Sequence, residues 1–168
     1  MGIEVSAVHT LTRKEEGEKT LKERVFRELL RKLEETVRNM ERLLRADFDG
    51  DGDEVDAANY LATTRTGAVL SLRISKLKEE INSLSCLDLS ERETVSPGAL
   101  IVAEVDGKKE RYLVLPAESF SRFERLEVDG EEYFTLTTRA PLYEALRGKR
   151  EGDEVFVNGT KVVILEVS

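Results

Sequence analysis

A long stripe of apolar residues at helical spacing most constrains what this chain can fold into. Between residues 20 and 45, apolar side chains recur every three or four residues after a first wider gap: Leu21, Phe26, Leu29, Leu33, Val37, Met40 and Leu44. Glutamate and arginine predominate on the other faces, and the segment contains no proline or glycine. This spacing predicts an amphipathic helix whose apolar face must be covered by a partner.

A second helix is predicted from about residue 56 to residue 85. Its apolar stripe comprises Leu61, Leu70, Ile74, Leu77, Ile81 and Leu84. Two long helices joined by a short polar turn predict an antiparallel coiled-coil hairpin. At ~1.5 Å per residue, the first helix would be roughly 36–39 Å long. We therefore expect a rod that buries one seam between its helices and exposes its other faces.

The turn of this hairpin is strongly acidic. Six acids and no base lie between residues 47 and 56: Asp47, Asp49, Asp51, Asp53, Glu54 and Asp56. The rest of residues 1–90 holds 15 Lys and Arg against 12 Asp and Glu, so the rod itself is mildly basic. Because crowded carboxylates repel one another, such a cluster indicates a cation or a positively charged partner, or else a solubilising turn.

A calcium loop is one alternative for this turn. The aspartates at 47, 49, 51 and 53, together with Gly52, match the first half of an EF-hand loop. Ala58 stands at the twelfth position, where a bidentate glutamate is required, and Glu54 stands where an apolar residue is usual. Tight calcium binding is therefore not expected, whereas weak binding of a divalent cation stays open.

The second half of the chain has the pattern of a small sheet. After a connector that contains Ser96-Pro97-Gly98, strands are predicted at 99–105, 111–115, 133–137, 155–157 and 162–165, with turns at 106–107, 127–130 and 158–159. Pro141 begins a predicted short helix that ends near Gly148. The whole is predicted to be α+β: a flexible arm (1–18), the hairpin (19–85, acidic tip 47–56), a connector (86–98) and an antiparallel β domain (99–168).

Composition excludes several function classes. The net charge of −8 disfavours direct binding to duplex DNA. No apolar run approaches the ~18 residues of a membrane span. The single cysteine, Cys86, excludes an intramolecular disulfide and cannot form a cysteine metal site alone. The single histidine, His9, lies in the predicted polar arm without a second histidine, so a histidine-based catalytic triad or zinc site is not expected. We expect a cytoplasmic monomer without a tightly bound cofactor.

Two further segments carry short motifs. The run 141–155 contains Pro141-Leu142, Ala145-Leu146, Gly148-Lys149 and Gly152-Asp153-x-Val155. In these residues it resembles the signature of the Gre transcription factors, with Ala140 in place of the usual Ser. The run 52–60 resembles the Gre tip, with Asp56 where Glu is usual. The spacing Asp53-x-x-Asp56-x-Ala58 is also similar to the tip of the DksA regulators, whose zinc-finger end a single cysteine cannot supply.

The resemblance implies a partner and a mode of action. An FKBP-like sheet domain would dock on bacterial RNA polymerase at the rim of its secondary channel, through Pro141, Leu142, Gly148, Lys149, Gly152 and Asp153. The hairpin would enter the channel, with Asp53, Asp56 and Ala58 modulating the active site and Asp47, Asp49, Asp51 and Glu54 supporting them. Asp53 and Asp56 would approach the catalytic Mg²⁺ of the polymerase, so the chain would have no active site of its own.

The tip residues favour regulation or inhibition over Gre-type stimulation of transcript cleavage. Asp56 is one methylene shorter than glutamate, Ala57 replaces an asparagine, and Glu54 adds repulsion. Two alternatives from other classes stay open. One is a peptidyl-prolyl isomerase, whose pocket would use aromatic residues among Phe120, Phe123, Tyr133, Phe134, Tyr143 and Phe156. The other is a structural coiled-coil protein with an inert tip.

Overall fold

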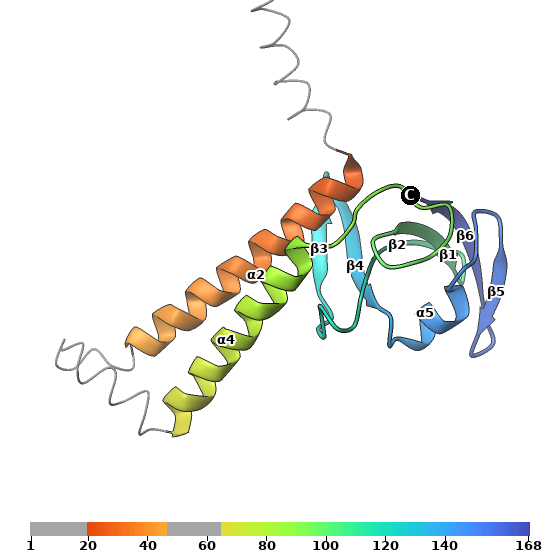
Figure 1. The fold of residues 1–168 in the computed structure, drawn as a ribbon. Helices are drawn as coiled ribbons and strands as arrows, with labels where there is room; N and C mark the ends of the chain where they lie inside the picture. Colours follow the sequence, from red (N-terminus) through yellow and green to blue (C-terminus); the bar gives the residue numbers. More distant parts are fainter. Residues whose placement is uncertain (1–19, 47–64) are drawn as a thin grey trace, which may run out of the picture.

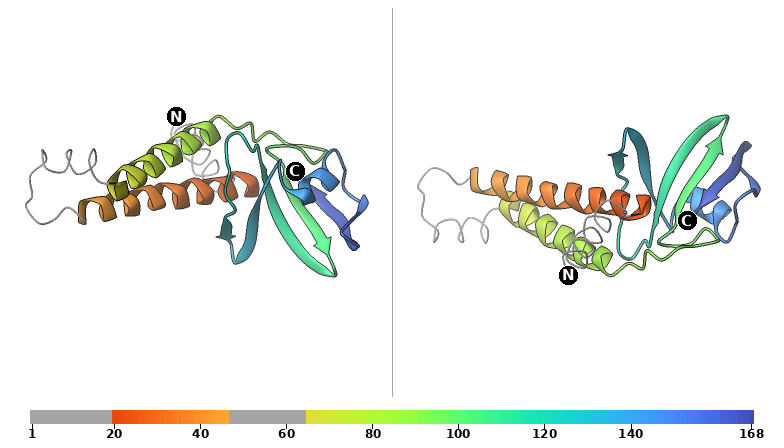
Figure 2. Two further views of the ribbon diagram at one scale, coloured as in Figure 1. Left: turned by 90° about the horizontal axis from the view of Figure 1, so that it is seen from below. Right: turned by 90° about the horizontal axis from the view of Figure 1, so that it is seen from above.

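The chain forms a long helix pair followed by a six-stranded sheet (Figure 1). The computed structural model describes residues 20–46 and 65–168. Helices α2 (Leu21–Ala46) and α4 (Arg65–Ser85) run antiparallel to each other, and their distal ends point away from the sheet (Figure 2). The predicted α+β class and helix pair are therefore confirmed. The predicted arm, and the start of the second helix near residue 56, lie outside the described residues.

Local sequence explains where α2 begins. The Oγ1 atom of Thr20 accepts a hydrogen bond from the backbone N–H of Glu23 at 3.2 Å. This bond satisfies one of the amide groups that have no partner within the first helical turn. Glu23 also places a negative charge at the positive end of the helix dipole.

The sheet has the strand order β3-β4-β2-β1-β6-β5. Its strands are β1 (Leu100–Val105), β2 (Lys108–Leu115), β3 (Arg125–Val128), β4 (Glu131–Thr137), β5 (Glu154–Val157) and β6 (Thr160–Val167), and α5 (Pro141–Leu146) lies between β4 and β5 in sequence. The predicted turns at Asp106-Gly107 and Asn158-Gly159 are confirmed, and both residues of each turn have positive φ, as type I′ turns require. Residues 127 and 128, predicted as part of a turn, belong to β3.

One strand pair contradicts the prediction of a wholly antiparallel sheet. β2 and β4 are parallel, in register from Tyr112 opposite Phe134 to Leu115 opposite Thr137. The chain leaves β2, crosses residues 116–124 and forms the edge strand β3 before turning back into β4. This path places β3 at the edge and β4 directly beside β2, so two strands that run in the same direction become neighbours. Alternating hydrophobicity identifies strands but carries no information on their relative direction.

Both faces of the sheet are covered. Along β2, Leu113 and Leu115 belong to a core shared with the helix pair, whereas Tyr112 and Val114 belong to a second core that includes Tyr143 of α5. The alternation follows from the period of two residues in a strand. The sheet is thus the middle layer between the helix pair and the short helix α5.

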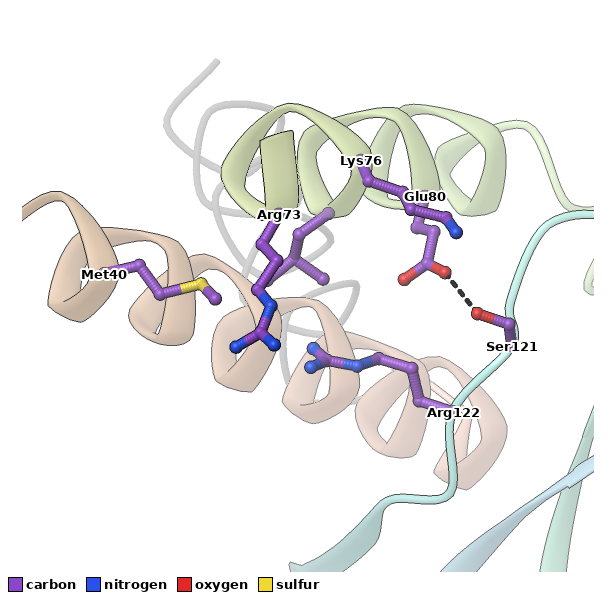
Figure 3. Close-up of a pocket in the computed structure, with 7 residues that line it drawn as sticks. Met40, Arg73, Lys76, Glu80, Ser121 and Arg122 are labelled. Carbon is purple, nitrogen blue, oxygen red and sulfur yellow. Dashed lines mark hydrogen bonds between the residues drawn. The ribbon is translucent and has the colours of Figure 1, made fainter. Parts of the chain in front are cut away.

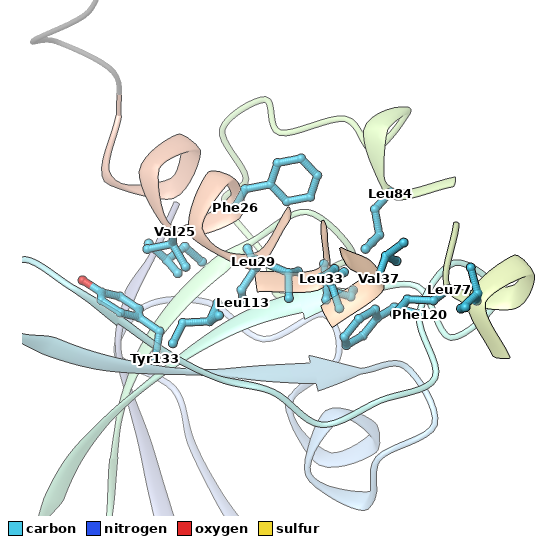
Figure 4. Close-up of a cluster of buried hydrophobic side chains, with 14 residues drawn as sticks. Val25, Phe26, Leu29, Leu33, Val37, Leu77, Leu84, Leu113, Phe120 and Tyr133 are labelled. Atoms are coloured by element: carbon cyan, nitrogen blue, oxygen red, sulfur yellow. The ribbon is translucent and has the colours of Figure 1, made fainter. Parts of the chain in front are cut away.

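Helix α2 packs against the sheet as well as against α4 (Figure 4). The core shared by the helix pair and the sheet includes Val25, Phe26, Leu29, Leu33, Val37, Leu77, Leu84, Leu113, Leu115, Phe120, Leu126 and Tyr133. The expectation of a rod with a single buried seam is therefore wrong. It failed because the apolar face of α2 is wide enough to cover two partners at its proximal end.

The predicted stripe also needs correction at its first residue. Leu21 is 38% exposed, whereas Val25, which is not part of the predicted stripe, is completely buried. Val25 and Leu29 are four residues apart, so they lie on the same face of α2, one turn from each other. The remaining first-helix residues of the stripe are buried or packed against the core, and Leu61 of the second helix lies outside the described residues.

Polar contacts reinforce the junction between helices and sheet. The Nζ atom of Lys32 donates to the carbonyl oxygen of Arg125 at 2.7 Å and lies 3.1 Å from a carboxylate oxygen of Glu124. The buried Lys22 donates from Nζ to the carbonyl oxygen of Ser90, in the connector, at 3.0 Å. Burial, and secondly the nearby charge of Arg92, lower the pKa of Lys22. These contacts hold α2 in one orientation relative to the sheet and the connector.

The shared core predicts that helices and sheet unfold together. Leu33→Ala should reduce the free energy of unfolding by about 2–5 kcal/mol, because Leu33 is completely buried between α2 and its partners. In Leu33→Ala, unfolding can be followed by the helical signal and by the near-ultraviolet tyrosine signal, to which buried Tyr133 contributes. Both signals should be lost at the same midpoint, which should be lower than in the wild type. Leu43→Ala is the matched control, because Leu43 is 59% exposed. A tyrosine transition that keeps its wild-type midpoint in Leu33→Ala would contradict the shared core.

Candidate functional site

The acidic tip and the signature loop are the two predicted parts of the site. The seven predicted tip residues lie outside the described residues: Asp47, Asp49, Asp51, Asp53, Glu54, Asp56 and Ala58. The described ends that flank them, Ala46 of α2 and Arg65 of α4, lie at the distal end of the helix pair (Figure 1). The assignments made for the tip stay predictions.

The signature begins at α5, which packs onto the face of the sheet opposite the helix pair. Pro141 occupies the start of the helix, and Ala140 precedes it in an extended conformation without a side-chain cap. The replacement of serine by Ala140 therefore coincides with an uncapped helix start. Tyr143 and Leu146 are buried in the core under α5, while Pro141 is exposed and Leu142 is half-buried.

The loop after α5 is held by backbone hydrogen bonds to two distant segments. The N–H of Gly148 donates to the carbonyl oxygen of Val95 at 3.0 Å, and the N–H of Val95 donates to that of Lys149 at 2.9 Å. The N–H of Gly152 donates to the carbonyl oxygen of Ile164, in β6, at 2.7 Å. The connector and the last strand thus define the path of this loop.

Asp153 shapes the same loop. Its Oδ2 accepts a hydrogen bond from the backbone N–H of Arg150 at 2.8 Å, and its own N–H donates to the carbonyl oxygen of Arg150 at 3.0 Å. Gly148 and Gly152 have φ values of 76° and 91°, in the region that residues with a side chain rarely adopt. Gly148, Gly152 and Asp153 therefore each have a structural role, independent of any partner.

The six predicted docking residues lie on one segment, 141–153, which runs from α5 to the start of β5. Of these, Pro141 and Lys149 have exposed side chains that the loop geometry does not require. Sequence reasoning missed the contribution of the connector, where Val95 is 1% exposed and pairs with the loop. The signal available was a single apolar residue directly before Ser96-Pro97, which is too short a pattern to predict pairing.

The aromatic residues considered for an isomerase pocket lie in different environments. Phe120 and Tyr133 are buried in the core under the helix pair, and Tyr143 is buried in the core under α5. Phe123 and Phe156 are each 69% exposed. Phe134 stacks on Phe123, with ring centroids 5.6 Å apart. Among the described residues, these side chains do not converge on one pocket.

The described residues offer neither a cluster of metal ligands nor a membrane-spanning helix. In residues 20–46 and 65–168, no three His, Cys, Asp or Glu side chains group together in a way that could hold a metal ion. Neither α2 nor α4, nor any other helix of this part of the chain, combines the length and apolar character needed to cross a membrane.

Comparisons with known proteins found likeness only among solved structures. No protein-family model matches the chain, and no curated protein matches it. The chain is similar to GreA factor homolog 1 (Gfh1) of Thermus thermophilus, with 16% sequence identity, 88% of this chain and 94% of that chain covered, and a TM-score of 0.34. It is also similar to Gfh1 of Thermus aquaticus, with 16% identity, 84% and 90% covered, and a TM-score of 0.33. Likeness at this level does not establish a common function.

The loop geometry makes a prediction about Gly148. Gly148→Ala should lower the free energy of unfolding by about 1–2 kcal/mol, because alanine is strained at this positive φ. No atom lies within 4 Å of the added Cβ, so steric overlap does not contribute. Gly148→Asn should lose less, since asparagine tolerates this region better. Urea denaturation of the three proteins measures the difference, and equal losses for alanine and asparagine would contradict the backbone explanation.

Proposed function

We propose that this chain is a transcription factor that binds bacterial RNA polymerase and acts on it through the acidic segment between its two long helices. The sheet, in the role of an FKBP-like domain, docks at the rim of the secondary channel. The helix pair enters the channel and delivers the tip to the active site. The chemistry belongs to the polymerase, and this chain contributes charged groups.

The observation that carries the proposal is the unbroken course of α2 from the sheet to the acidic segment. α2 has 26 residues, which corresponds to about 39 Å. Its proximal half is buried against the sheet, whereas Met40 and Leu44, further along, are only partly buried. A sheet and an acidic segment that are linked by one continuous helix fit a factor that acts at a fixed distance from where it binds.

The signature loop supports the choice of partner. Its resemblance to the Gre signature extends over 15 residues, 141–155. Pro141, at the start of this run, and Lys149, in its second half, are exposed. They supply an apolar and a positively charged contact for a partner surface. Electrostatic contacts of this kind contribute to specificity and to the rate of association.

Asp53 and Asp56 are the groups that act at the tip. Their carboxylates approach the Mg²⁺ that the polymerase itself binds, and Mg²⁺ favours oxygen ligands. Regulation or inhibition of RNA synthesis is the main output. Asp56 reaches less far than glutamate, and Glu54 adds negative charge beside it. Two-metal hydrolysis tolerates little misplacement of a ligand, so these changes disfavour strong stimulation of cleavage.

A double substitution tests the tip. Asp53→Asn with Asp56→Asn should leave the affinity for polymerase unchanged, because docking is assigned to the sheet domain, and should abolish the effect on RNA synthesis. The measurements are polymerase affinity, transcript yield, and cleavage of RNA in a backtracked complex. The control is Glu34→Gln with Glu79→Gln, which removes the same charge from exposed positions along the helix pair.

The outcomes of this test separate the alternatives. Full activity of the double tip variant would exclude the tip mechanism. Vigorous transcript cleavage by the unmodified protein would contradict the preference for regulation. Proline isomerisation of a short peptide by a protein that does not bind polymerase would favour the isomerase alternative.

A charge reversal tests the docking surface. Lys149→Glu should weaken polymerase binding by roughly tenfold, as expected when a positive contact becomes repulsive. Lys108→Glu, in an exposed residue at the start of β2, is the matched control and should bind as the wild type does. Equal affinities for all three proteins would show that docking does not involve the signature loop. Full-length protein is required, because residues 99–168 alone would expose the core that α2 covers.

A further inference from the structure

A positively charged pocket lies at the base of the helix pair, where α4 faces the segment between β2 and β3 (Figure 3). Its volume is about 240 Å³. Arg73 and Lys76 line it from α4, and Arg122 lines it from the segment between the strands. Arg73 and Lys76 are three residues apart, so they project from the same face of α4. Met40 of α2 and Leu77 of α4 supply its apolar wall.

The charges around this pocket are unbalanced. Three cationic side chains line it against one acid, Glu80, whose Oε1 accepts a hydrogen bond from the Ser121 hydroxyl at 2.7 Å. Within residues 20–46 and 65–168, neither Arg73 nor Lys76 nor Arg122 forms an ion pair within 4.0 Å. Figure 3 shows the guanidinium groups of Arg73 and Arg122 directed toward each other. Like charges in this arrangement repel, so the pocket favours an anion.

One atom of Arg122 makes the case stronger. Its Nη1 is buried, yet it has no hydrogen-bond partner in the part of the chain that the structure describes. Buried polar groups in folded proteins almost always have a partner, and a charged donor left without one destabilises the fold. Because this atom is covered, an oxygen acceptor in the pocket would reach it only after the guanidinium group turns. That movement would cost no hydrogen bond at Nη1, since the atom has none in the described part of the chain. The excess positive charge of the pocket is therefore the main argument for an anionic ligand, and the unpartnered nitrogen is consistent with it.

We propose that this pocket binds a phosphate group, either as free phosphate or as a phosphomonoester. A guanidinium group matches phosphate oxygens with two parallel N–H donors, and a lysine ammonium binds phosphate as a point charge. The net charge of +2 from three cations and Glu80 suits a dianion better than a single carboxylate. The bound phosphate bridges α4 to the segment 116–124 and so strengthens the junction of the helix pair with the sheet. This site does not depend on polymerase binding.

Thermal unfolding and calorimetric titration of the full-length protein test the site. Inorganic phosphate at millimolar concentration should raise the Tm, because a ligand that binds only the folded state stabilises it by mass action. Sodium chloride at equal ionic strength should not produce this rise. A nucleoside 5′-monophosphate forms the second arm. Tighter binding of the nucleotide identifies a phosphomonoester as the ligand, and equal or weaker binding identifies free phosphate.

Arg122→Gln should weaken phosphate binding by roughly tenfold or more, as expected for a lost charge-assisted contact. In buffer without phosphate this variant should be at least as stable as the wild type, since it removes an unpartnered buried donor and a repulsive charge. Lys76→Gln, in an exposed residue, is the second variant and should also lose the phosphate response. Arg38→Gln, in an exposed residue of α2 outside the pocket, should keep it. A wild-type response in both pocket variants, or an equal response to chloride, would overturn the proposal.

Discussion

The packing of the proximal half of α2 against two partners is the interaction on which the remaining structure depends. One face of this helix contacts α4 and the sheet at once, through completely buried residues such as Val25, Leu29 and Leu33. Burial of a side chain of this size contributes about 1.5–3 kcal/mol. If α2 were displaced, both the seam of the helix pair and the part of the sheet that α2 covers would be exposed to water. The two halves of the chain therefore form one structural unit at their junction.

This unit determines how a charge at the far end of the helices could be used. Helix α2 is held to the sheet by Lys32 and by the core, and to the connector by Lys22, so it has a defined direction from the sheet. Such rigidity suits a factor whose acids must reach a metal site inside another protein. The proposed phosphate pocket, around Arg122, lies at the same junction, so its occupancy would act on the element that sets this direction.

The signature loop contains some residues that its geometry requires and others that it does not. Gly148 and Gly152 occupy positive φ, and Asp153 closes the loop through the backbone of Arg150. These residues would be required in any chain with the same loop, whatever its partner. The case for docking therefore depends most on Lys149 and Pro141, whose exposed side chains have no such structural requirement.

The sequence alone determined most of the elements of this protein, although the strand β3 was not predicted. The three-to-four-residue spacing of apolar residues predicted both helices, and the Asp-Gly and Asn-Gly pairs predicted the turns, because these patterns act over short stretches of chain. The six-acid cluster and the signature run were also visible there, with the docking residues on one segment. Tertiary structure alone decided how these elements combine. Three features join residues far apart in sequence: the parallel pairing of β2 with β4, the pairing of Val95 with the signature loop, and the convergence of Arg73 with Arg122. A fourth, the burial of Val25 in place of Leu21, depends on which partner covers the face of α2. Local periodicity specifies that a face must be covered, whereas the covering partner is chosen by the packing of the whole chain.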